Sequence, residues 1–356
     1  MKILCVTSYA TLNILLILST TIESTNARST SKPPTSASVL RDLLSQSFES
    51  KKTIAVPGVH DALSAKIFTQ NKSNVLFLSG FGVSASHLAQ PDAGILTLSE
   101  MEEATRNVVA ATNSMYSDTS PPPPVIVDGD TGYGGAANVR RTIRNLAKAG
   151  AAAITIEDQI FPKKCTYAAG ENIRVISQSE ACARIKTALS ARKEAKDIDG
   201  NDVLIIARTD CRAALGMEEV IQRCLKFEEL GADIVYAENL QSKEEYIQLR
   251  HLLKPTTPMM LAQLQLGQEP STQTLYPMEE MGEMGYNLAL FGVTALQATV
   301  ATLQSVAKGF DQGQVFHSIQ DTLETKSSVQ LSPFSEVKNV VGFPELDDFV
   351  QENPCL

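Results

Sequence analysis

Several short apolar runs in this sequence each end on charged residues. In chain order, these residues are Asp128 with Asp130, Glu157 with Asp158, Arg208, and Glu238. Short runs rich in β-branched residues are typical of strands buried on both faces. Helical patterns separate the runs, so we expect parallel strands whose C-terminal ends meet at one rim, where barrel and open-sheet enzymes hold their active sites. Carboxylates that converge there repel one another unless a cation or shared protons offset them, and a divalent metal ion is the simplest such cation.

The alternation of strand and helix patterns continues along most of the chain. Helical patterns at residues 139–149 and 218–230 are followed by Gly150 and Gly231, which suit helix C-termini, and a third spans residues 180–196. About eight βα units over this length predict a (β/α)₈ TIM-type barrel as one domain, with a doubly wound open sheet as the alternative. The strand-like runs lie at residues 53–56, 75–79, 125–128, 153–156, 203–208, 234–237, 259–262 and 288–291.

The N-terminus has the pattern of a targeting segment. Lys2 precedes a mostly apolar stretch, and small residues follow that stretch, so we expect residues 1–27 to be a signal or targeting segment that directs the chain into the secretory route or an organelle. A single transmembrane anchor is the alternative. We expect residues 28–45 to form a flexible leader, residues 46–310 the catalytic barrel and residues 311–356 a C-terminal helical extension.

Composition limits the partners. The net charge is −9, which argues against binding to nucleic acid. Beyond the first segment no stretch is membrane-like, so we expect no stable membrane insertion once the leader is removed. The six cysteines are widely spaced and predict neither a disulfide framework nor a structural zinc site.

A glycine-rich run after the third predicted strand allows another interpretation. Residues 132–137 match the GxGxxA pattern of dinucleotide-binding folds. Two acids precede these glycines where a pyrophosphate would have to approach, and two βα units lie upstream. Nucleotide binding is therefore the less favoured alternative. The connector over residues 159–179 has no apolar period and leaves the same rim, so we expect it to act as a lid.

Eight motifs in order along the chain resemble the isocitrate lyase and phosphoenolpyruvate mutase superfamily, in particular its methylisocitrate lyase-like and oxaloacetate hydrolase-like branch. This resemblance implies a (β/α)₈ barrel whose last helix is exchanged with a neighbouring subunit, a homo-oligomer built as a dimer of dimers, and Mg²⁺ at the rim, with Mn²⁺ as a substitute. The motifs are PGVHDALSA at residues 57–65, SGFG at 79–82, PDAG at 91–94, DGDTGYG at 128–134, EDQ at 157–159, KKC at 163–165, ARTD at 207–210, and Glu238.

The resemblance also implies a set of metal ligands. Asp130 corresponds to the direct ligand, and Asp92, Asp128 and Glu157 correspond to acids that hold the metal through bound water. The chemistry agrees, because Mg²⁺ favours a few carboxylates, several waters and substrate oxygens over a closed protein cage.

The residues implied to bind substrate come from other motifs. Ser79, Gly80 and Gly82 resemble the segment whose hydroxyl and backbone donors hold a substrate carboxylate. Arg208 ends a buried strand and needs an anion, and the resemblance favours a substrate carboxylate over a structural partner. Glu238 resembles an acid that binds substrate or handles a proton.

Cys165 is implied to carry the chemistry of cleavage. In lyases of this family, a cysteine in a KKCGH motif lies on a mobile loop and protonates the enolate that remains after carbon–carbon cleavage. Lys163 and Lys164 can bring the pKa of such a thiol toward neutrality, so Lys163 is a further catalytic candidate.

The chain departs from the lyase pattern at a few positions. Thr166 and Tyr167 replace the expected GlyHis pair, and Phe77 stands where some lyases have a tyrosine. After the seventh strand, the chain replaces a pattern that usually supplies an Asn and, soon after, a Glu, which changes the polar wall around the distal end of the substrate. The replacing residues are Ala262, Gln263, Leu264, Gln265 and Leu266. Gln263 remains a substrate-binding candidate.

The leading hypothesis is a Mg²⁺-dependent carbon–carbon lyase, or hydrolase, acting on a small 2-hydroxy or 2-oxo dicarboxylate. One alternative is phosphonate chemistry of the phosphoenolpyruvate mutase or carboxyphosphonoenolpyruvate phosphonomutase kind, which does not need Cys165. Another is a catalytically weakened barrel that serves as a binding or assembly module.

Overall fold

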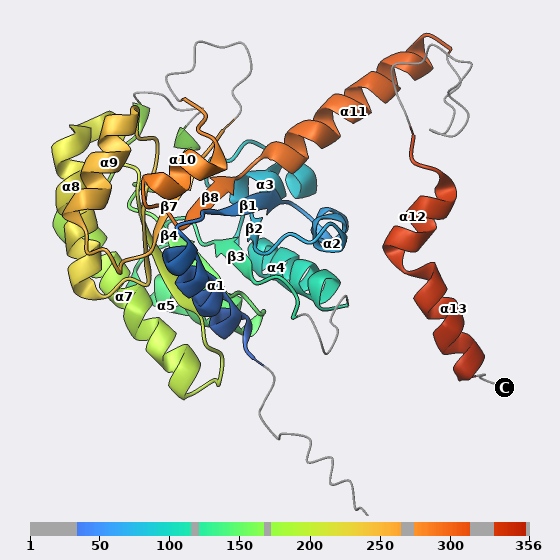
Figure 1. Ribbon diagram of the computed structural model, residues 1–356, viewed down its shortest axis with the longest axis horizontal. Helices are drawn as coiled ribbons and strands as arrows, with labels where there is room; N and C mark the ends of the chain where they lie inside the picture. The colour runs from blue at the N-terminus through green and yellow to red at the C-terminus, as the bar shows by residue number, and fades with distance from the viewer. Residues whose placement is uncertain (1–33, 115–120, 167–171, 265–273, 314–330, 354–356) are drawn as a thin grey trace, which may run out of the picture. The chain divides into compact units, whose positions relative to one another are not determined.

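Eight parallel strands form a closed barrel in sequence order, β1 to β8 (Figure 1). The computed structural model describes residues 34–114, 121–166, 172–264, 274–313 and 331–353. Pairing of β1 with β8, from Ile54 with Leu288 to Pro57 with Phe291, closes the sheet. The predicted barrel is therefore confirmed, and the doubly wound alternative is wrong, because an open sheet leaves two unpaired edges. The strands are β1 Ile54–Val59, β2 Leu76–Leu78, β3 Val125–Asp128, β4 Ala153–Ile156, β5 Leu204–Thr209, β6 Ile234–Ala237, β7 Met259–Ala262 and β8 Leu288–Phe291.

Helices surround the barrel, and their ends follow from local sequence. Thr97 and Ser177 begin α4 and α7 with reciprocal capping boxes to Glu100 and Glu180. Helix α8 ends at Gly231, as the sequence predicted, and Gly231 adopts the left-handed conformation. The helices are α1 Ser36–Ser50, α2 Ala62–Gln70, α3 Gly80–Leu88, α4 Leu98–Asn113, α5 Ala136–Lys148, α7 Gln178–Asp197, α8 Arg212–Leu230, α9 Lys243–Leu252, α10 Met278–Glu283, α11 Thr294–Asp311, α12 Phe334–Val341 and α13 Phe343–Glu352.

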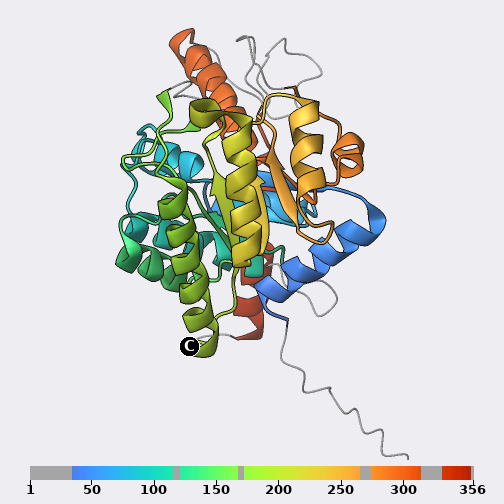
Figure 2. The same cartoon turned by 90° about the vertical axis from the view of Figure 1, so that its left-hand side faces the viewer.

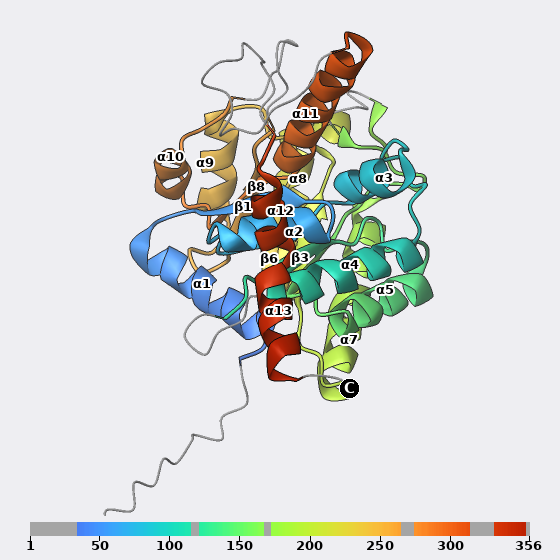
Figure 3. The same cartoon turned by 90° about the vertical axis from the view of Figure 1, so that its right-hand side faces the viewer.

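The helices follow one another around the sheet. Helices α7, α8 and α9 lie side by side along one flank (Figure 2). Helices α2, α4, α5 and α7 continue around the other side (Figure 3). Within the described residues, no helix combines the length and apolar character needed to cross a membrane.

Apolar side chains form two layers, one between the sheet and the helices and one inside the barrel. The inner layer includes Ala37, Leu40 and Leu44 of α1, packed with strand residues such as Val56 and Ile126. Helix α1 therefore belongs to the barrel domain.

The predicted flexible leader, residues 28–45, is corrected over its second part. The structure has a helix from Ser36, because its apolar residues recur at helical spacing and Thr35 caps its first turn. The predicted signal segment, residues 1–27, lies outside the described residues.

Candidate active site

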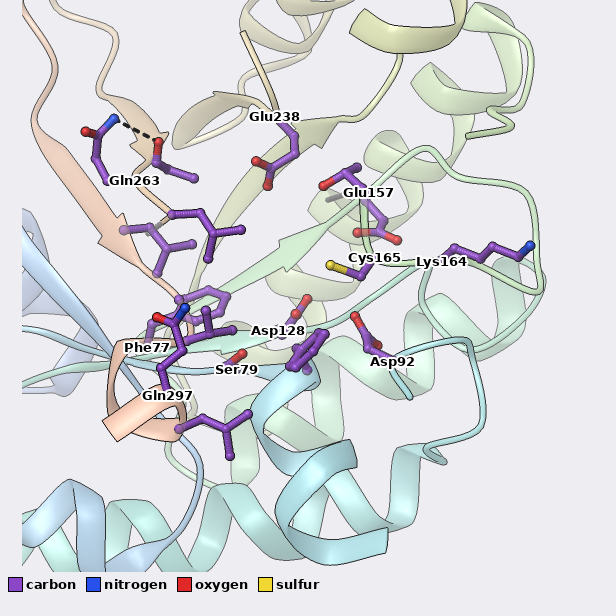
Figure 4. Close-up of a pocket in the computed structure, with 18 of the residues that line it drawn as sticks. Phe77, Ser79, Asp92, Asp128, Glu157, Lys164, Cys165, Glu238, Gln263 and Gln297 are labelled. Atoms are coloured by element: carbon purple, nitrogen blue, oxygen red, sulfur yellow. Dashed lines mark hydrogen bonds between the residues drawn. The ribbon is translucent and has the colours of Figure 1, made fainter. Parts of the chain in front are cut away.

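A cavity of about 550 Å³ opens at the C-terminal ends of the strands. In Figure 4 the thiol of Cys165 points into the space between Glu157 and Asp128. The structure thus brings together residues that lie far apart in the sequence. The predicted site residues that line the cavity are Ser79, Asp92, Asp128, Glu157, Lys163, Cys165, Arg208, Glu238 and Gln263.

The turn after β3 positions two of the acids. Asp130 has φ +47°, a left-handed conformation that is strained for a residue with a side chain. Hydrogen bonds hold the turn: Glu157 N donates to Asp130 O at 3.0 Å, and Thr155 Oγ1 donates to Asp128 Oδ1 at 3.1 Å. The strain is therefore maintained by the neighbouring strand β4.

The Lys163 ammonium lies among the acids. Lys163 Nζ is 2.6 Å from both Asp92 Oδ1 and Asp130 Oδ1, and its side chain is buried. Burial alone would lower the pKa of Lys163, but Asp130 and Asp92 outweigh that effect and raise it well above its usual value. Lys163 is therefore a fixed positive charge, and its direct partners are carboxylates.

Burial also changes the pKa values of the acids. Burial raises the pKa of Asp130 to about 6. The positive charge of Lys163 lowers this pKa, and the negative charge of Asp128 raises it further. Burial and the nearby Asp210 raise the pKa of Glu157 well above its usual value, although Arg208 opposes this. A cation that enters this group would offset the repulsion.

Arg208 is surrounded by three acids. Its Nε lies 2.8 Å from Asp210 Oδ1 and 3.4 Å from Glu157 Oε2, and its Nη2 lies 3.2 Å from Glu238 Oε2. The sequence left two alternatives for the anion that Arg208 binds: a structural partner or a substrate carboxylate. The ion pair with Asp210 provides the structural partner, and Arg208 also lines the cavity, where a substrate could reach it.

Tyr236 is a site residue that the sequence interpretation missed. Its hydroxyl donates to Glu238 Oε2, and its ring lies under the Arg208 guanidinium, 5.4 Å from ring centre to Cζ. The spacing could have revealed it, because residues two apart on a strand face the same side. Tyr236 therefore fixes both charged neighbours from within the barrel.

The segment around Ser79 makes hydrogen bonds within the protein. Ser79 lines the cavity, but its hydroxyl caps α3 by accepting from Gly82 N at 3.1 Å. Gly80 N donates to Asp128 Oδ2 at 3.2 Å, and neither Gly80 nor Gly82 is among the residues that line the cavity. These two amides therefore organise the site. A side chain at Gly80 would come within 2.9 Å of Asp128 Oδ2.

Gln263 lines the cavity with its amide engaged by backbone groups. Its Oε1 accepts from Tyr276 N at 2.7 Å, and its Nε2 donates to Ala262 O at 3.0 Å. Phe77 and Thr166 also line the cavity. Two further departures from the lyase pattern, Tyr167 and Leu266, lie outside the described residues.

The acids offer the type of oxygen that a divalent ion binds. Glu157 Oε1 is buried and has no hydrogen-bond partner within the described part of the chain. Over the same residues, no group of three or more His, Cys, Asp or Glu side chains is placed so that it could hold a metal ion. Carboxylate oxygens are the ligands that Mg²⁺ prefers, and the buried Glu157 Oε1 offers one such oxygen.

Comparison with known proteins identifies the family of the chain. Residues 44–310 match the family model described as phosphoenolpyruvate phosphomutase. The 2,3-dimethylmalate lyase of Eubacterium barkeri is 32% identical over 87% of this chain and 95% of its own length. The 2-methylisocitrate lyase of Aeropyrum pernix is 34% identical over 81% of this chain and 84% of its own length.

Solved structures of related enzymes have the same fold as this chain. Oxaloacetate acetylhydrolase in complex with 3,3-difluorooxalacetate has a TM-score of 0.75 at 29% identity, over 89% of this chain and 97% of the other. Phosphonopyruvate hydrolase in complex with oxalate and Mg²⁺ has a TM-score of 0.70 at 25% identity, over 90% of this chain and 99% of the other. The chain therefore belongs to the phosphoenolpyruvate phosphomutase family, within the isocitrate lyase and phosphoenolpyruvate mutase superfamily.

Proposed function

We propose that this protein is a Mg²⁺-dependent carbon–carbon lyase that acts on a small 2-hydroxy or 2-oxo dicarboxylate, in the manner of methylisocitrate lyase. The observation that carries the proposal is the position of the Cys165 thiol, which faces the same cavity as Asp128, Glu157 and Arg208 (Figure 4). Phosphonate chemistry needs the acids but does not need this thiol. Hydrolysis of oxaloacetate is a close variant of the proposed reaction.

Asp130 would hold the metal ion directly, and Asp92, Asp128 and Glu157 would hold it through water. When bound, Mg²⁺, or Mn²⁺ in its place, supplies Lewis acidity toward the oxygen on C2 of the substrate. Arg208 binds the oxo-acid half of the substrate, since its guanidinium is held by acids on one side and lines the cavity on the other.

The chain's own residues handle the protons. Glu238 accepts the proton of the C2 hydroxyl, and the C2–C3 bond breaks with its electron pair going to C3. The Cys165 thiol then gives its proton to C3, which yields an oxo acid and a carboxylate. The proton held by Glu238 returns to the thiolate, so the enzyme is restored.

A second copy of this chain would cover the exposed apolar residues near the C-terminus. Phe310, Phe334 and Phe349 on α11, α12 and α13 are each more than half exposed. Such exposure is unusual for large apolar side chains in a monomer. We propose the helix exchange and dimer of dimers that the family resemblance implies.

We also propose that residues 1–27 direct the chain into the secretory route or an organelle.

A substrate screen tests the proposal. The purified protein is incubated with Mg²⁺ or with a chelator and offered methylisocitrate, dimethylmalate, oxaloacetate or phosphonopyruvate. We expect carbon–carbon cleavage with Mg²⁺, its loss with the chelator and its return when Mg²⁺ is added back. Conversion of phosphonopyruvate alone would instead support phosphonate chemistry. Binding of a dicarboxylate without turnover would support a binding module.

A further inference from the structure

Gln159, the last residue of the EDQ motif, is a buried amide in the wall of the cavity, with 2% of the residue exposed. Its backbone is fixed from behind: Gln159 forms an isolated antiparallel bridge with Val175, and its carbonyl accepts from Arg184 Nη1 at 3.0 Å. A buried side chain that starts from a fixed backbone has few conformations open to it. The hydrogen bonds of the Gln159 amide therefore determine where its partners lie.

The Gln159 amide binds both backbone groups of Lys164. Its Nε2 donates to the Lys164 carbonyl at 2.9 Å, and its Oε1 accepts from the Lys164 N–H at 3.0 Å. An amide that exchanges both bonds with one residue pairs with it as a neighbouring strand would. In Figure 4 the side chain of Lys164 extends away from the Cys165 thiol. Gln159 thus holds the main chain at the residue directly before Cys165.

The same amide also reaches the partner of Arg208. The second Nε2 hydrogen of Gln159 is donated to Asp210 Oδ2 at 2.7 Å. Asp210 accepts from Arg208 through both oxygens, with Nε at 2.8 Å from Oδ1 and Nη2 at 3.3 Å from Oδ2. The three hydrogen bonds use both donors and the acceptor of Gln159. The reversed amide would place its NH₂ group against the Lys164 N–H, so the partners allow one orientation only.

We infer that Gln159 is a positioning residue that sets the Cys165 thiol relative to the Arg208 guanidinium. This inference rests on the proposed lyase function, in which Arg208 binds the substrate and Cys165 gives the proton. Gln159 connects the two groups, through Asp210 to the guanidinium and through Lys164 to the thiol. Proton transfer requires the donor within hydrogen-bond reach of the acceptor, and a misplacement of about 1 Å can lower a rate by about 100-fold.

Gln159→Leu removes all three hydrogen bonds while it nearly conserves the volume of the side chain. We expect kcat to fall about 100-fold, with KM and the Kd of Mg²⁺ within about threefold of wild type, because Arg208 and the metal-site acids keep their other contacts. Asn287→Leu is the matched control. Asn287 is also a buried amide, with bonds to Met259 N at 3.1 Å and Ser47 Oγ at 3.2 Å, but it precedes β8 at the opposite end of the barrel and does not line the cavity. This variant should keep the wild-type kcat.

Alkylation by iodoacetamide reports the position of the thiol without any turnover. Mass spectrometry of the peptides gives the rate at each cysteine, and Cys182, a free cysteine outside the cavity, is the internal reference. Access controls the reactivity of a thiol, and Gln159→Leu releases the chain that carries Cys165. We therefore expect the rate at Cys165 relative to Cys182 to rise at least about fivefold in this variant, and to stay within about twofold of wild type in Asn287→Leu.

The possible outcomes are distinguishable. If Cys165 in Gln159→Leu reacts at the wild-type rate, or if kcat falls equally in Gln159→Leu and Asn287→Leu, the inference is wrong while cleavage by the wild-type protein still supports the lyase function. If the wild-type protein cleaves none of the substrates of the screen above, the proposed function fails, and the alkylation rates alone decide whether Gln159 positions the thiol. Should Gln159→Leu not fold, Gln159→Glu replaces it with the same expectations, since this variant loses both donated bonds and faces the Asp210 carboxylate.

Discussion

Glu157 and Asp158 are consecutive residues after β4, and their carboxylates lie on opposite sides of the barrel wall. Glu157 lines the cavity, with its Oε2 3.4 Å from Arg208 Nε. Asp158 accepts from Thr209 Oγ1 at 2.6 Å and from Arg223 Nη1 at 2.8 Å, behind the strand. The first carboxylate is therefore available for binding and catalysis, and the second stabilises the attachment of α8.

Neutral substitutions at these two positions should affect different properties: metal binding and turnover at Glu157, and stability at Asp158. Glu157→Gln is expected to weaken Mg²⁺ binding and lower turnover by roughly 10- to 100-fold, as loss of a water-mediated metal partner does, with stability within about 1 kcal/mol of wild type. Asp158→Asn leaves the buried Arg223 without this partner and should lower the free energy of unfolding by about 3 kcal/mol. Metal titration and denaturant unfolding measure the two effects. Equal loss of stability in both variants would contradict this division.

Tyr236 should act through Glu238. Tyr236→Phe removes the hydroxyl that donates to Glu238 Oε2, and a hydrogen bond to a charged group contributes about 1.5–3 kcal/mol. We therefore expect kcat to fall at least tenfold, with a smaller change in KM. Tyr246→Phe is the control, because Tyr246 is also buried, bonds the Leu240 carbonyl and does not line the cavity. An unchanged kcat in the Tyr236 variant would show that Glu238 is held in place without it.

The attachment of α1 should depend on pH. Arg41 Nη1, on α1, lies 2.7 Å from Asp202 Oδ2. Burial would raise the pKa of Asp202, but the hydrogen bond from Arg41 outweighs it and holds the pKa below its usual value. An acid whose pKa is lowered by folding adds stability above its unfolded pKa, near 4, and that stability is lost as pH falls through the folded value.

Arg41→Gln should therefore lower the free energy of unfolding by about 0.5–1 kcal/mol at pH 7, since Arg41 is partly exposed. The difference from wild type should shrink as pH falls below 4. Urea unfolding at several pH values measures it. A difference that stays constant from pH 7 to pH 2.5 would mean that the ion pair is not its cause.

The barrel could be predicted from sequence because its strands are short, mostly apolar runs at regular spacing. β3, β4, β6, β7 and β8 have the predicted bounds. Helix α1 was missed because Ser and Thr dominate the sequence before it, while the apolar residues that bury it, such as Leu40 and Leu44, meet their partners only inside the barrel.

The site could be predicted only as a set of residues. Spacing and resemblance predicted the acids, Arg208 and Cys165. All of them except Asp92 come from strand ends or the loop that follows, and Asp92 lies between α3 and α4. Their contacts depend on pairing across the barrel, so the sequence did not reveal that Lys163 lies between Asp92 and Asp130. It also did not reveal that the Gly80 amide is engaged by Asp128.

We propose that the Cys165 thiol supplies the proton after carbon–carbon cleavage, and the turnover of a Cys165→Ser variant measures whether it does. Cys182→Ser is the control, because Cys182 is a free cysteine that does not line the cavity. With the best substrate of the screen and saturating Mg²⁺, the Cys165 variant should lose ~10²- to 10⁴-fold in kcat while it still binds metal, and the control should keep its activity. A Cys165→Ser enzyme whose kcat stays within about threefold of wild type would show that the thiol is not the proton donor.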